Sequence, residues 1–377
     1  ATRVSGGIMR PEVAQALVEA TQHCVDMAEL QGRASEIIAE HTGAEAGIIT
    51  SGASAGLLLG TAACVTGLDP AKMNQLPDPK GLRNEVVIVR SQRNFYDHAV
   101  RATGVRLVEV GIADRFAGAG VRDTESWEIA DALNENTACV FYVAQPHSRP
   151  RLSAVTEAAH QAGVPVLVDA AAQLPPVDNL RHFIAQGADL VSFSAGKAIL
   201  GPQGTGILAG RRDLVAAALL QNLDQDLFFE QWRPPQSLFH GVQLRGLPQH
   251  GIGRSCKVGK EEIVAALIAL KHFAQEDIHA RHQDCRMRLE QLGDNLIASL
   301  RERATIDGDN NDTEPVLRLR FPDPETAFDM VVRLQDGEPC IHADPSFVDD
   351  GIVELRALCL GENDHLTIAR RLNELAS

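Results

Sequence analysis

Short apolar runs alternate with amphipathic segments along most of the chain. Apolar runs of strand length occupy residues 48–49, 86–89, 106–111, 138–143, 164–171, 189–194 and 207–209. Apolar residues at helical spacing predict helices at 11–20, 29–41, 125–134, 154–162 and 212–220. Strands that alternate with helices over short connections are typical of an α/β protein with a mainly parallel, doubly wound sheet.

The pattern changes toward the C-terminus. A long helix is predicted from Ile263 through Phe273 and beyond, after the irregular stretch 222–250. The alternating residues 315–321 predict a half-exposed strand, followed by a helix at 324–335, a strand at 351–358 and a helix at 362–375. This order predicts a smaller α+β unit at the C-terminal end.

One lysine stands directly after a predicted buried strand. The strand at 189–194 runs into Ser194-Ala195-Gly196-Lys197, and a glycine-rich turn follows at 201–206. An ammonium group near apolar strand ends loses hydration, which favours the neutral amine that a Schiff-base lysine needs. Taken alone, a lysine in such a loop is more commonly a solvated surface residue.

An aspartate ends the preceding predicted strand. Asp169 closes the apolar run 164–168, one strand upstream of Lys197. Ligands in open α/β sheets collect at the carboxyl ends of the strands. A strand-end aspartate followed by a strand-end lysine is the pair that pyridoxal phosphate requires, because the carboxylate keeps the ring nitrogen protonated and the lysine carries the aldehyde.

A turn of small residues lies earlier in the chain. The short strand at 48–49 runs into Thr50-Ser51-Gly52-Ala53-Ser54-Ala55-Gly56, and a helix follows. Free backbone N–H groups and the positive end of a helix favour a phosphate at such a place. Ser54 could equally be an ordinary helix N-cap. The position of this turn before Asp169 and Lys197 gives it weight.

On these residues the chain resembles the fold-type-I pyridoxal 5'-phosphate enzymes. The string SAGK…LGPQGTGIL resembles the SelA-like branch (selenocysteine synthase and D-glucosaminate-6-phosphate ammonia-lyase), in which a serine, the lysine and a Gly-Pro-Gln turn recur together. The resemblance covers roughly residues 5–375. It implies an aspartate aminotransferase-like fold, with a mainly parallel seven-stranded sheet and a small α+β C-terminal domain. We expect an N-terminal segment at 1–30 that packs on the small domain, a cofactor-binding domain at 31–255 and the small domain at 256–377.

The resemblance also implies roles for individual residues. Lys197 and Asp169 would be catalytic, and the cofactor would be bound by Gly52, Ala53, Ser54, Phe95, Asp169, Ser194, Lys197 and, from a neighbouring subunit, Arg254. Tyr96 and His98 are alternatives to Phe95 as the ring over the cofactor, and Lys257 is an alternative to Arg254. Ser5, Arg93, His147 and Arg356 are candidate substrate contacts, with Gln145, Arg149 and Arg318 as further candidates. Solvated loop and strand positions explain the substrate candidates about as well.

Composition limits the class of partner. The chain of 377 residues has 35 basic against 50 acidic residues and a net charge of −15, without a basic block, which argues against nucleic acid and against a tRNA substrate. No apolar run approaches the roughly 18 residues of a membrane span. Seven scattered cysteines without a CxxC pair predict reduced thiols in the cytoplasm. Thirteen histidines show no metal-binding spacing, so no metal is expected.

Two other enzyme classes fit the motifs less well. A dinucleotide dehydrogenase needs GxGxxG directly after its first strand, and the glycine turns at 118–120 and 201–206 do not have that place or spacing. Ser194 and Lys197 match the SxxK string of some serine hydrolases, but the partner motifs SDN and KTG do not occur.

We therefore predict a homodimeric or higher homo-oligomeric pyridoxal-phosphate lyase. It would catalyse α,β-elimination on a small β-substituted amino acid and release a 2-oxo acid and ammonia. Retro-aldol cleavage or racemisation would use the same residues and stays open, because the bond that breaks depends on substrate contacts. A SelA-like transferase or a non-catalytic paralogue is the remaining alternative.

Overall fold

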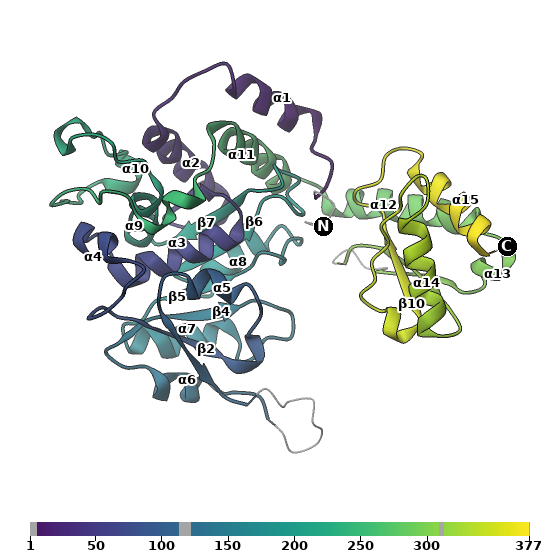
Figure 1. The fold of residues 1–377 in the computed structure, drawn as a ribbon, viewed down its shortest axis with the longest axis horizontal. Helices are drawn as coiled ribbons and strands as arrows, with labels where there is room; N and C mark the ends of the chain where they lie inside the picture. Colours follow the sequence, from purple (N-terminus) through teal and green to yellow (C-terminus); the bar gives the residue numbers. More distant parts are fainter. Residues whose placement is uncertain (1–5, 113–121, 309–312, 377) are drawn as a thin grey trace. The chain divides into compact units, whose positions relative to one another are not determined.

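A computed structural model describes residues 6–112, 122–308 and 313–376 (Figure 1). Contacts along the chain group it into a larger unit, Met9–Gln275, and a smaller unit that combines Glu276–Ser377 with the N-terminal residues up to Ile8. Each unit has its own hydrophobic core. The predicted domain boundaries at residues 30 and 255 stay a prediction.

The larger unit is built on a seven-stranded sheet in the order β1-β7-β6-β5-β4-β2-β3. Its strands are β1 Ala46–Thr50, β2 Glu85–Val89, β3 Arg106–Val110, β4 Thr137–Val143, β5 Val166–Asp169, β6 Leu190–Ser194 and β7 Gly206–Gly210. The pairs from β3 through β6 are parallel, and β7 runs antiparallel to both β6 and β1. The predicted mainly parallel sheet of fold type I is confirmed.

Helices cover both the sheet and its edges. They are α1 Pro11–Ala20, α2 Met27–Thr42, α3 Ala53–Thr66, α4 Pro70–Gln75, α5 Asp97–Arg101, α6 Ser126–Ala132, α7 Leu152–Gln161, α8 Asn179–Ala185, α9 Arg212–Asn222, α10 Gln236–Phe239 and α11 Lys260–Ala274. Helix α3 contacts β4, β5, β6 and β7 and is apolar nearly all round, as a helix buried against a sheet must be (Figure 1). Among the described residues, no helix has the length and apolar character needed to cross a membrane.

The outer edge of β1 is covered by side chains of α2. Gln31 accepts a hydrogen bond from the N–H of Ile49 at 3.0 Å and donates one to the carbonyl of the same residue at 2.8 Å. The Ser35 hydroxyl accepts from the N–H of Gly47 at 3.2 Å. These contacts satisfy backbone groups that an edge strand would otherwise expose, so β1 and the turn that follows it are firmly placed.

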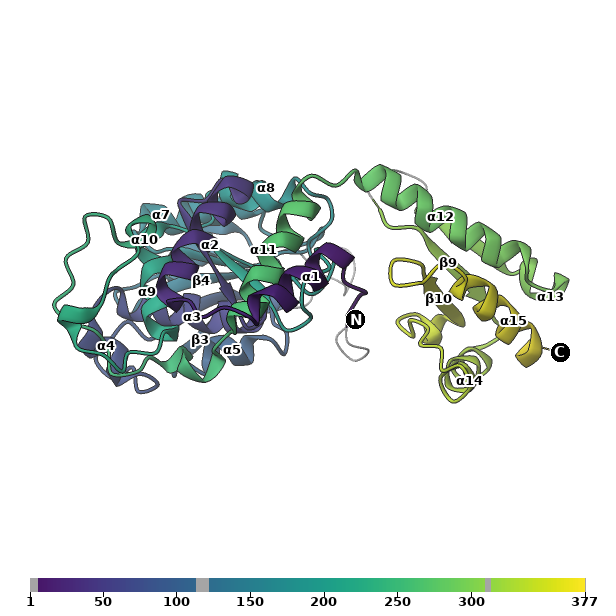
Figure 2. The ribbon, with the colours of Figure 1, turned by 90° about the horizontal axis from the view of Figure 1, so that it is seen from above.

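The smaller unit packs helices on one face of a three-stranded antiparallel sheet (Figure 2). Its elements are α12 Ile278–Asp294, α13 Ala298–Arg301, β8 Ala304–Asp307, β9 Val316–Arg320, α14 Pro324–Gln335, β10 Ile352–Arg356 and α15 Asp364–Ala376. Leu317, Leu319, Val353 and Leu355 point into its core. The predicted C-terminal α+β unit is confirmed.

The predicted long helix from Ile263 through Phe273 and beyond is present as α11, Lys260–Ala274. Helix α11 ends at Ala274, and α12 begins anew at Ile278. Asp277 starts the second helix by accepting a hydrogen bond from the N–H of Ala280 at 3.1 Å. An N-cap aspartate of this kind is a start signal that the sequence does carry.

Candidate active site

The sheet register brings three predicted segments to the same edge. Asp169 at the end of β5 lies opposite Ser192 of β6. Gly206, at the start of β7, pairs with Ser194 on one side and with Thr50 on the other. The turn after β1, the end of β5 and the loop after β6 therefore meet at the edge where ligands of open α/β sheets bind.

The first turn of α3 offers free hydrogen-bond donors. Gly52 precedes the helix with φ +93°, a left-handed conformation that favours glycine, and it provides no side-chain cap. In the described chain, the N–H groups of residues 53–55 have no acceptor, and the exposed Ser54 hydroxyl has no partner. A Cβ at Gly206 would lie 2.5 Å from the Ala53 nitrogen, so β7 can pass this turn only as glycine. The geometry suits a phosphate.

Neighbouring side chains hold this turn in place, and the sequence analysis missed them. The Thr50 hydroxyl donates to the carbonyl of Gly52 at 2.9 Å, and the Ser192 hydroxyl donates to the carbonyl of Ala53 at 2.8 Å. The Ser51 hydroxyl donates to the carbonyl of Cys256 at 2.7 Å. Ser192 is fully buried inside an apolar run, and a polar residue at such a place was the available signal.

Asp169 is a buried carboxyl group with one free oxygen. Asp169 is 8% exposed. Its Oδ1 accepts a hydrogen bond from the N–H of Ala171 at 3.0 Å. Burial raises the pKa of Asp169, and the Ala171 N–H and the charge of Lys197 offset part of that rise. Within the described residues Oδ2 has no partner, so it can accept a hydrogen bond from a ligand.

Lys197 sits in a tightly folded loop beside Asp169. The loop is closed by hydrogen bonds from the N–H of Ala195 to Thr205 at 3.0 Å and from the N–H of Gly201 back to the carbonyl of Ala195 at 2.9 Å. A Cβ at Gly196 would lie 2.3 Å from the carbonyl oxygen of Gln203, so two arms of the loop touch there. The half-buried Lys197 and Ser194 side chains have no hydrogen-bond or ion-pair partner in the described chain.

These groups fit pyridoxal phosphate. The N–H groups at the start of α3 and the hydroxyls of Ser54 and Ser194 suit its phosphate, the free oxygen of Asp169 suits its ring nitrogen, and Lys197 suits its aldehyde. The predicted residues Gly52, Ala53, Ser54, Asp169, Ser194 and Lys197 are thus brought to one edge of the sheet. Their roles remain predictions that the geometry favours.

The Arg93 guanidinium is engaged by carboxylates. It forms ion pairs with Asp97 and with Glu109. Burial alone would raise the pKa of Asp97, but hydrogen bonds from Arg93 and Arg101 hold it below its usual value. A substrate anion could therefore bind Arg93 only by displacing Asp97 or Glu109 from its guanidinium group.

The other candidates between β2 and α7 lie at the surface of the described chain. Phe95 is 88% exposed and Tyr96 is 64% exposed, and His147 is exposed as well. Gln92, which the sequence analysis did not single out, links this region to β4, because it accepts from the N–H of Val143 at 3.0 Å. Ser5 lies outside the described residues. The substrate contacts predicted for Ser5, Arg93, His147 and Arg356 stay predictions.

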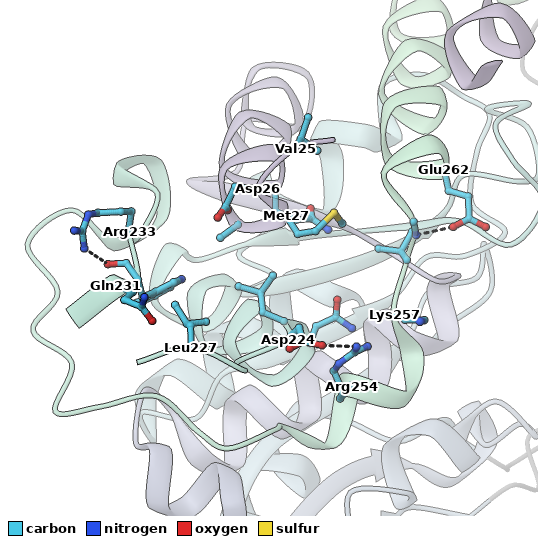
Figure 3. A pocket seen from close by; sticks show the side chains of 17 residues that line it. Val25, Asp26, Met27, Asp224, Leu227, Gln231, Arg233, Arg254, Lys257 and Glu262 are labelled. Atoms are coloured by element: carbon cyan, nitrogen blue, oxygen red, sulfur yellow. Dashed lines mark hydrogen bonds and ion pairs between the residues drawn. The ribbon is translucent and has the colours of Figure 1, made fainter. Parts of the chain in front are cut away.

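Arg254 and Lys257 line a cavity of about 730 Å³ (Figure 3). Between them in the chain lies Cys256, whose carbonyl accepts the hydrogen bond from the Ser51 hydroxyl. Arg254 forms an ion pair of 2.6 Å with Asp224, and that contact holds the pKa of Asp224 below its usual value. Lys257 has no partner in the described part of the chain. Asp226 and His250 form with Asp224 an exposed group of metal-ligand type. Arg254 already pairs with Asp224, and His250 lies 3.3 Å from Asp226.

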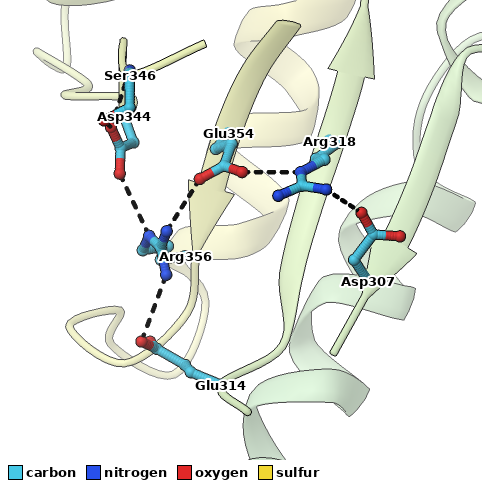
Figure 4. A network of polar contacts seen from close by, with 7 residues as sticks. All are labelled: Asp307, Glu314, Arg318, Asp344, Ser346, Glu354 and Arg356. Carbon is cyan, nitrogen blue, oxygen red and sulfur yellow. Dashed lines mark hydrogen bonds and ion pairs between the residues drawn. The ribbon is translucent and has the colours of Figure 1, made fainter. Parts of the chain in front are cut away.

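Arg356 belongs to a network of charges in the smaller unit (Figure 4). Its guanidinium lies 2.9 Å from the buried carboxylate of Glu354 and 3.3 Å from Asp344. Arg318 contacts the other oxygen of Glu354 at 2.8 Å and also pairs with Asp307. Both arginines that were predicted to bind a substrate carboxylate are bound here by carboxylates of the chain.

Ammonia-lyases match this chain along nearly its whole length. The D-glucosaminate-6-phosphate ammonia lyase of Salmonella typhimurium is 29% identical over 97% of this chain and 90% of that protein. A solved structure of a D-glucosaminate-6-phosphate ammonia-lyase has a TM-score of 0.80 and 28% identity, and the match covers 100% of this chain and 93% of that chain. An aminotransferase class-V family model matches residues 91–223.

Other relatives carry different activities. A 5'-C-glycyluridine monooxygenase-decarboxylase from a Streptomyces species is 29% identical over 99% of this chain and 87% of that protein. An L-seryl-tRNA(Sec) selenium transferase of Actinobacillus pleuropneumoniae is 30% identical, but over only 48% of this chain and 39% of that protein. The match to the transferase therefore covers about half of this chain, whereas the matches to the lyase and to the decarboxylase cover nearly all of it.

Proposed function

The chain belongs to the SelA-like group of fold-type-I pyridoxal 5'-phosphate enzymes, and on that premise we propose that it acts as an ammonia-lyase on a small β-substituted amino acid. The predicted family, fold type, cofactor and lyase class are confirmed by the aminotransferase class-V match and the similarity to D-glucosaminate-6-phosphate ammonia lyase. The substrate, the roles of single residues and the oligomeric state are our proposal.

The observation that carries the proposal is a set of unpartnered polar groups at one sheet edge. These groups have no hydrogen-bond partner among the described residues. They are the N–H groups of residues 53–55, the hydroxyls of Ser54 and Ser194, the Lys197 ammonium and Asp169 Oδ2. Of these residues Asp169 is buried, Ser194 and Lys197 are half-buried, and Ser54 is exposed. Donors and a free carboxylate oxygen that converge at the carboxyl ends of parallel strands support a ligand with a phosphate, a basic ring nitrogen and an aldehyde.

The chain's own residues supply the binding and the proton transfers. Bound pyridoxal phosphate supplies an electron sink for the electron pair left when a bond at the substrate Cα breaks. Asp169 keeps the ring nitrogen protonated. Lys197 would hold the aldehyde of the bound cofactor and, once substrate has displaced it, would move a proton from Cα to the group that leaves Cβ. A β-hydroxyl would leave as water, and hydrolysis of the resulting enamine would give the 2-oxo acid and ammonia.

A decarboxylase of the type named for the Streptomyces relative is the second candidate. Its support is the 29% identity over 99% of this chain, which matches that of the lyase. In this chain a decarboxylation would use the same Lys197 and Asp169, and it would break the bond from Cα to the carboxylate instead of the bond from Cα to hydrogen. Only a β-substituted substrate that yields ammonia without carbon dioxide supports the lyase.

We also propose a homodimer that is located in the cytoplasm. In the single chain, Phe95, Tyr96 and Phe228 are 88%, 64% and 76% exposed, and large exposed aromatics support an interaction surface. The free thiol state of all seven cysteines is consistent with a reducing compartment. Light scattering of the purified protein tests the dimer: a monomer at every concentration would refute it.

An absorption spectrum tests whether the cofactor binds at Lys197, and product analysis tests the lyase reaction. Purified protein saturated with pyridoxal phosphate should show the visible absorption band of lysine-bound cofactor. Lys197→Ala should remove that band, and Lys271→Ala, on the exposed part of α11, should keep it. A panel of β-hydroxy amino acids should then release ammonia and a 2-oxo acid with the wild type only. A band without ammonia release from any of them would refute the lyase but not the cofactor.

A further inference from the structure

Two arginines face each other across the sheet of the smaller unit. The N–H of Arg320 in β9 donates to the carbonyl of Arg303, directly before β8, at 3.1 Å. Thr305 and Arg318 form the next pair on the same side, because residues two apart along a strand share a face. The core side chains of β9 point to the opposite face. Arg303 and Arg320 are therefore neighbours on the outer face, and both are exposed.

Neither of these arginines has an ion-pair partner among the described residues. Arg318, one pair further along, is bound by Glu354 at 2.8 Å and by Asp307. Like charges directly opposite each other on adjacent strands destabilise a sheet. On its other side Arg320 pairs with Ile352 of β10, and this apolar residue offers no compensating charge. A bound anion shared by the two guanidinium groups would remove this repulsion.

The two arginines lie in a hollow that has an apolar wall. The hollow has a volume of about 600 Å³, and Pro322 and Ile352 line it together with the arginines. Phe321 borders it too, but this residue is buried in the core of the unit. Glu302 and Asp307 line it as well. Asp307 is held by Arg318, and Glu302 forms no ion pair with Arg303 or Arg320 within the described chain. The hollow thus contains three arginines and two carboxylates, of which Arg318 and Asp307 pair with each other, so its lining keeps a net positive charge beside Pro322 and Ile352.

We propose that Arg303 and Arg320 form a binding site for a phosphate monoester. The guanidinium groups of Arg303 and Arg320, which face each other on this sheet, can each donate a pair of hydrogen bonds to a phosphate, and their positive charges attract it. The apolar wall then contacts the group that the phosphate esterifies. This site is separate from the phosphate position at the start of α3, and it does not depend on the proposed reaction.

Calorimetric titration of the full-length protein saturated with pyridoxal phosphate tests this site. The bound cofactor occupies the donors of α3, so added phosphate reports on other sites. Phenyl phosphate and inorganic phosphate are the two probes, at constant ionic strength in chloride. Arg303→Gln and Arg320→Gln should each weaken binding of phenyl phosphate about 10- to 100-fold, because each removes hydrogen bonds to a charged group. Arg370→Gln, on the exposed face of α15, is the matched control and should leave the affinity unchanged.

Thermal melting separates binding from folding. Phenyl phosphate should raise the melting temperature of the wild type and of Arg370→Gln, but not that of Arg320→Gln. In chloride alone, Arg320→Gln should melt no lower than the wild type, because it removes the repulsion with Arg303. Absence of saturable binding, or equal binding by both arginine variants and the wild type, would overturn the proposal. Equal affinity for inorganic phosphate would overturn the monoester and leave a site for the bare ion.

Discussion

The hydroxyl of Ser192 donates a hydrogen bond of 2.8 Å to the carbonyl oxygen of Ala53 and so joins β6 to the first turn of α3. One turn further along α3, a Cβ at Gly56 would lie 2.4 Å from the same hydroxyl oxygen. The helix can approach the strand this closely only because position 56 has no side chain. This contact fixes the free N–H groups of α3 relative to the strand that leads to Lys197.

Gly56→Ala is therefore expected to push α3 away from β6. The new methyl group would meet the Ser192 hydroxyl at 2.4 Å but the Ser192 Cβ only at 3.4 Å, so the clash is with the hydroxyl. Overpacking of this kind should lower the free energy of unfolding by about 1–3 kcal/mol and weaken cofactor binding. In a Ser192→Ala background most of this loss should be recovered. Denaturant unfolding and cofactor titration of the four proteins of the cycle measure it.

Gly204→Ala is the matched control for that cycle. Gly204 lies in the loop after Lys197, and nothing within 4 Å would meet a Cβ there, so its replacement should cost little. Ser192→Ala alone should cost about 1 kcal/mol, the usual value of one buried hydrogen bond. Strictly additive losses in the double variant would show that the Gly56 methyl group clashes elsewhere.

The larger unit could be predicted from sequence because its strands are buried on both faces. Runs such as 138–143 are apolar throughout, and glycines end several of the connecting helices. The reversed direction of β7 could not be predicted in this way. Its run at 206–210 is as apolar as a parallel strand, and only the pairing of Gly206 with both Thr50 and Ser194 reveals the direction.

The candidate site was predictable where one residue type carries one chemistry. Lys197, Asp169 and the turn at 52–54 were identified because strand ends, helix starts and order along the chain restrict their positions. Ser192 and Gln92 were missed because their roles depend on contacts between distant segments. Nor could the sequence show that Arg93 and Arg356 are held by carboxylates, since those partners come from other strands and loops.

Loss of the Glu354 carboxylate should destabilise the smaller unit. Glu354 is fully buried between Arg318 and Arg356, at 2.8 Å and 2.9 Å. Glu354→Ala leaves both guanidinium groups without this partner and should cost about 3–5 kcal/mol, whereas Glu354→Gln keeps part of the hydrogen bonding and should cost less. Hydrogen exchange in β9 and β10 is the measurement, because the two units need not unfold together.

The control for this change is Glu374→Ala. Glu374 is 53% exposed and pairs with Arg371 at 3.1 Å on the surface of α15, so its loss should cost less than about 1 kcal/mol. Unchanged protection of β9 and β10 in Glu354→Ala would contradict the structural role of the network.

Asp169→Asn should abolish activity without destabilising the apoprotein. The amide cannot hold a proton on the cofactor ring nitrogen, and loss of a charge-assisted hydrogen bond should lower kcat by about 100-fold or more. Because burial raises the pKa of Asp169 above its ordinary value of 3.8, the folded chain binds this proton more tightly than the unfolded chain. The stabilisation that proton binding by Asp169 provides is fully present below pH 3.8, and it is lost as the pH rises through the pKa of Asp169 in the folded chain. The melting temperature of apo wild type relative to Asp169→Asn should therefore rise as pH is lowered from about 7 to about 4.

Asp97 should show the opposite pH dependence. Its carboxylate is buried and bonded by Arg93 and, at 3.0 Å, by Arg101, which hold its pKa below the ordinary value of 3.8 although burial acts against them. The folded chain therefore binds this proton less tightly than the unfolded chain. The stability that Asp97 contributes is present above 3.8 and is lost as pH falls through the lower, folded value. Asp97→Asn should cost about 1–3 kcal/mol at neutral pH, and this difference from the wild type should shrink in acid. Asp131→Asn, at an exposed position of α6, should show no such difference at any pH, and a cost for Asp97→Asn that did not change with pH would mean that packing, not charge, accounts for it.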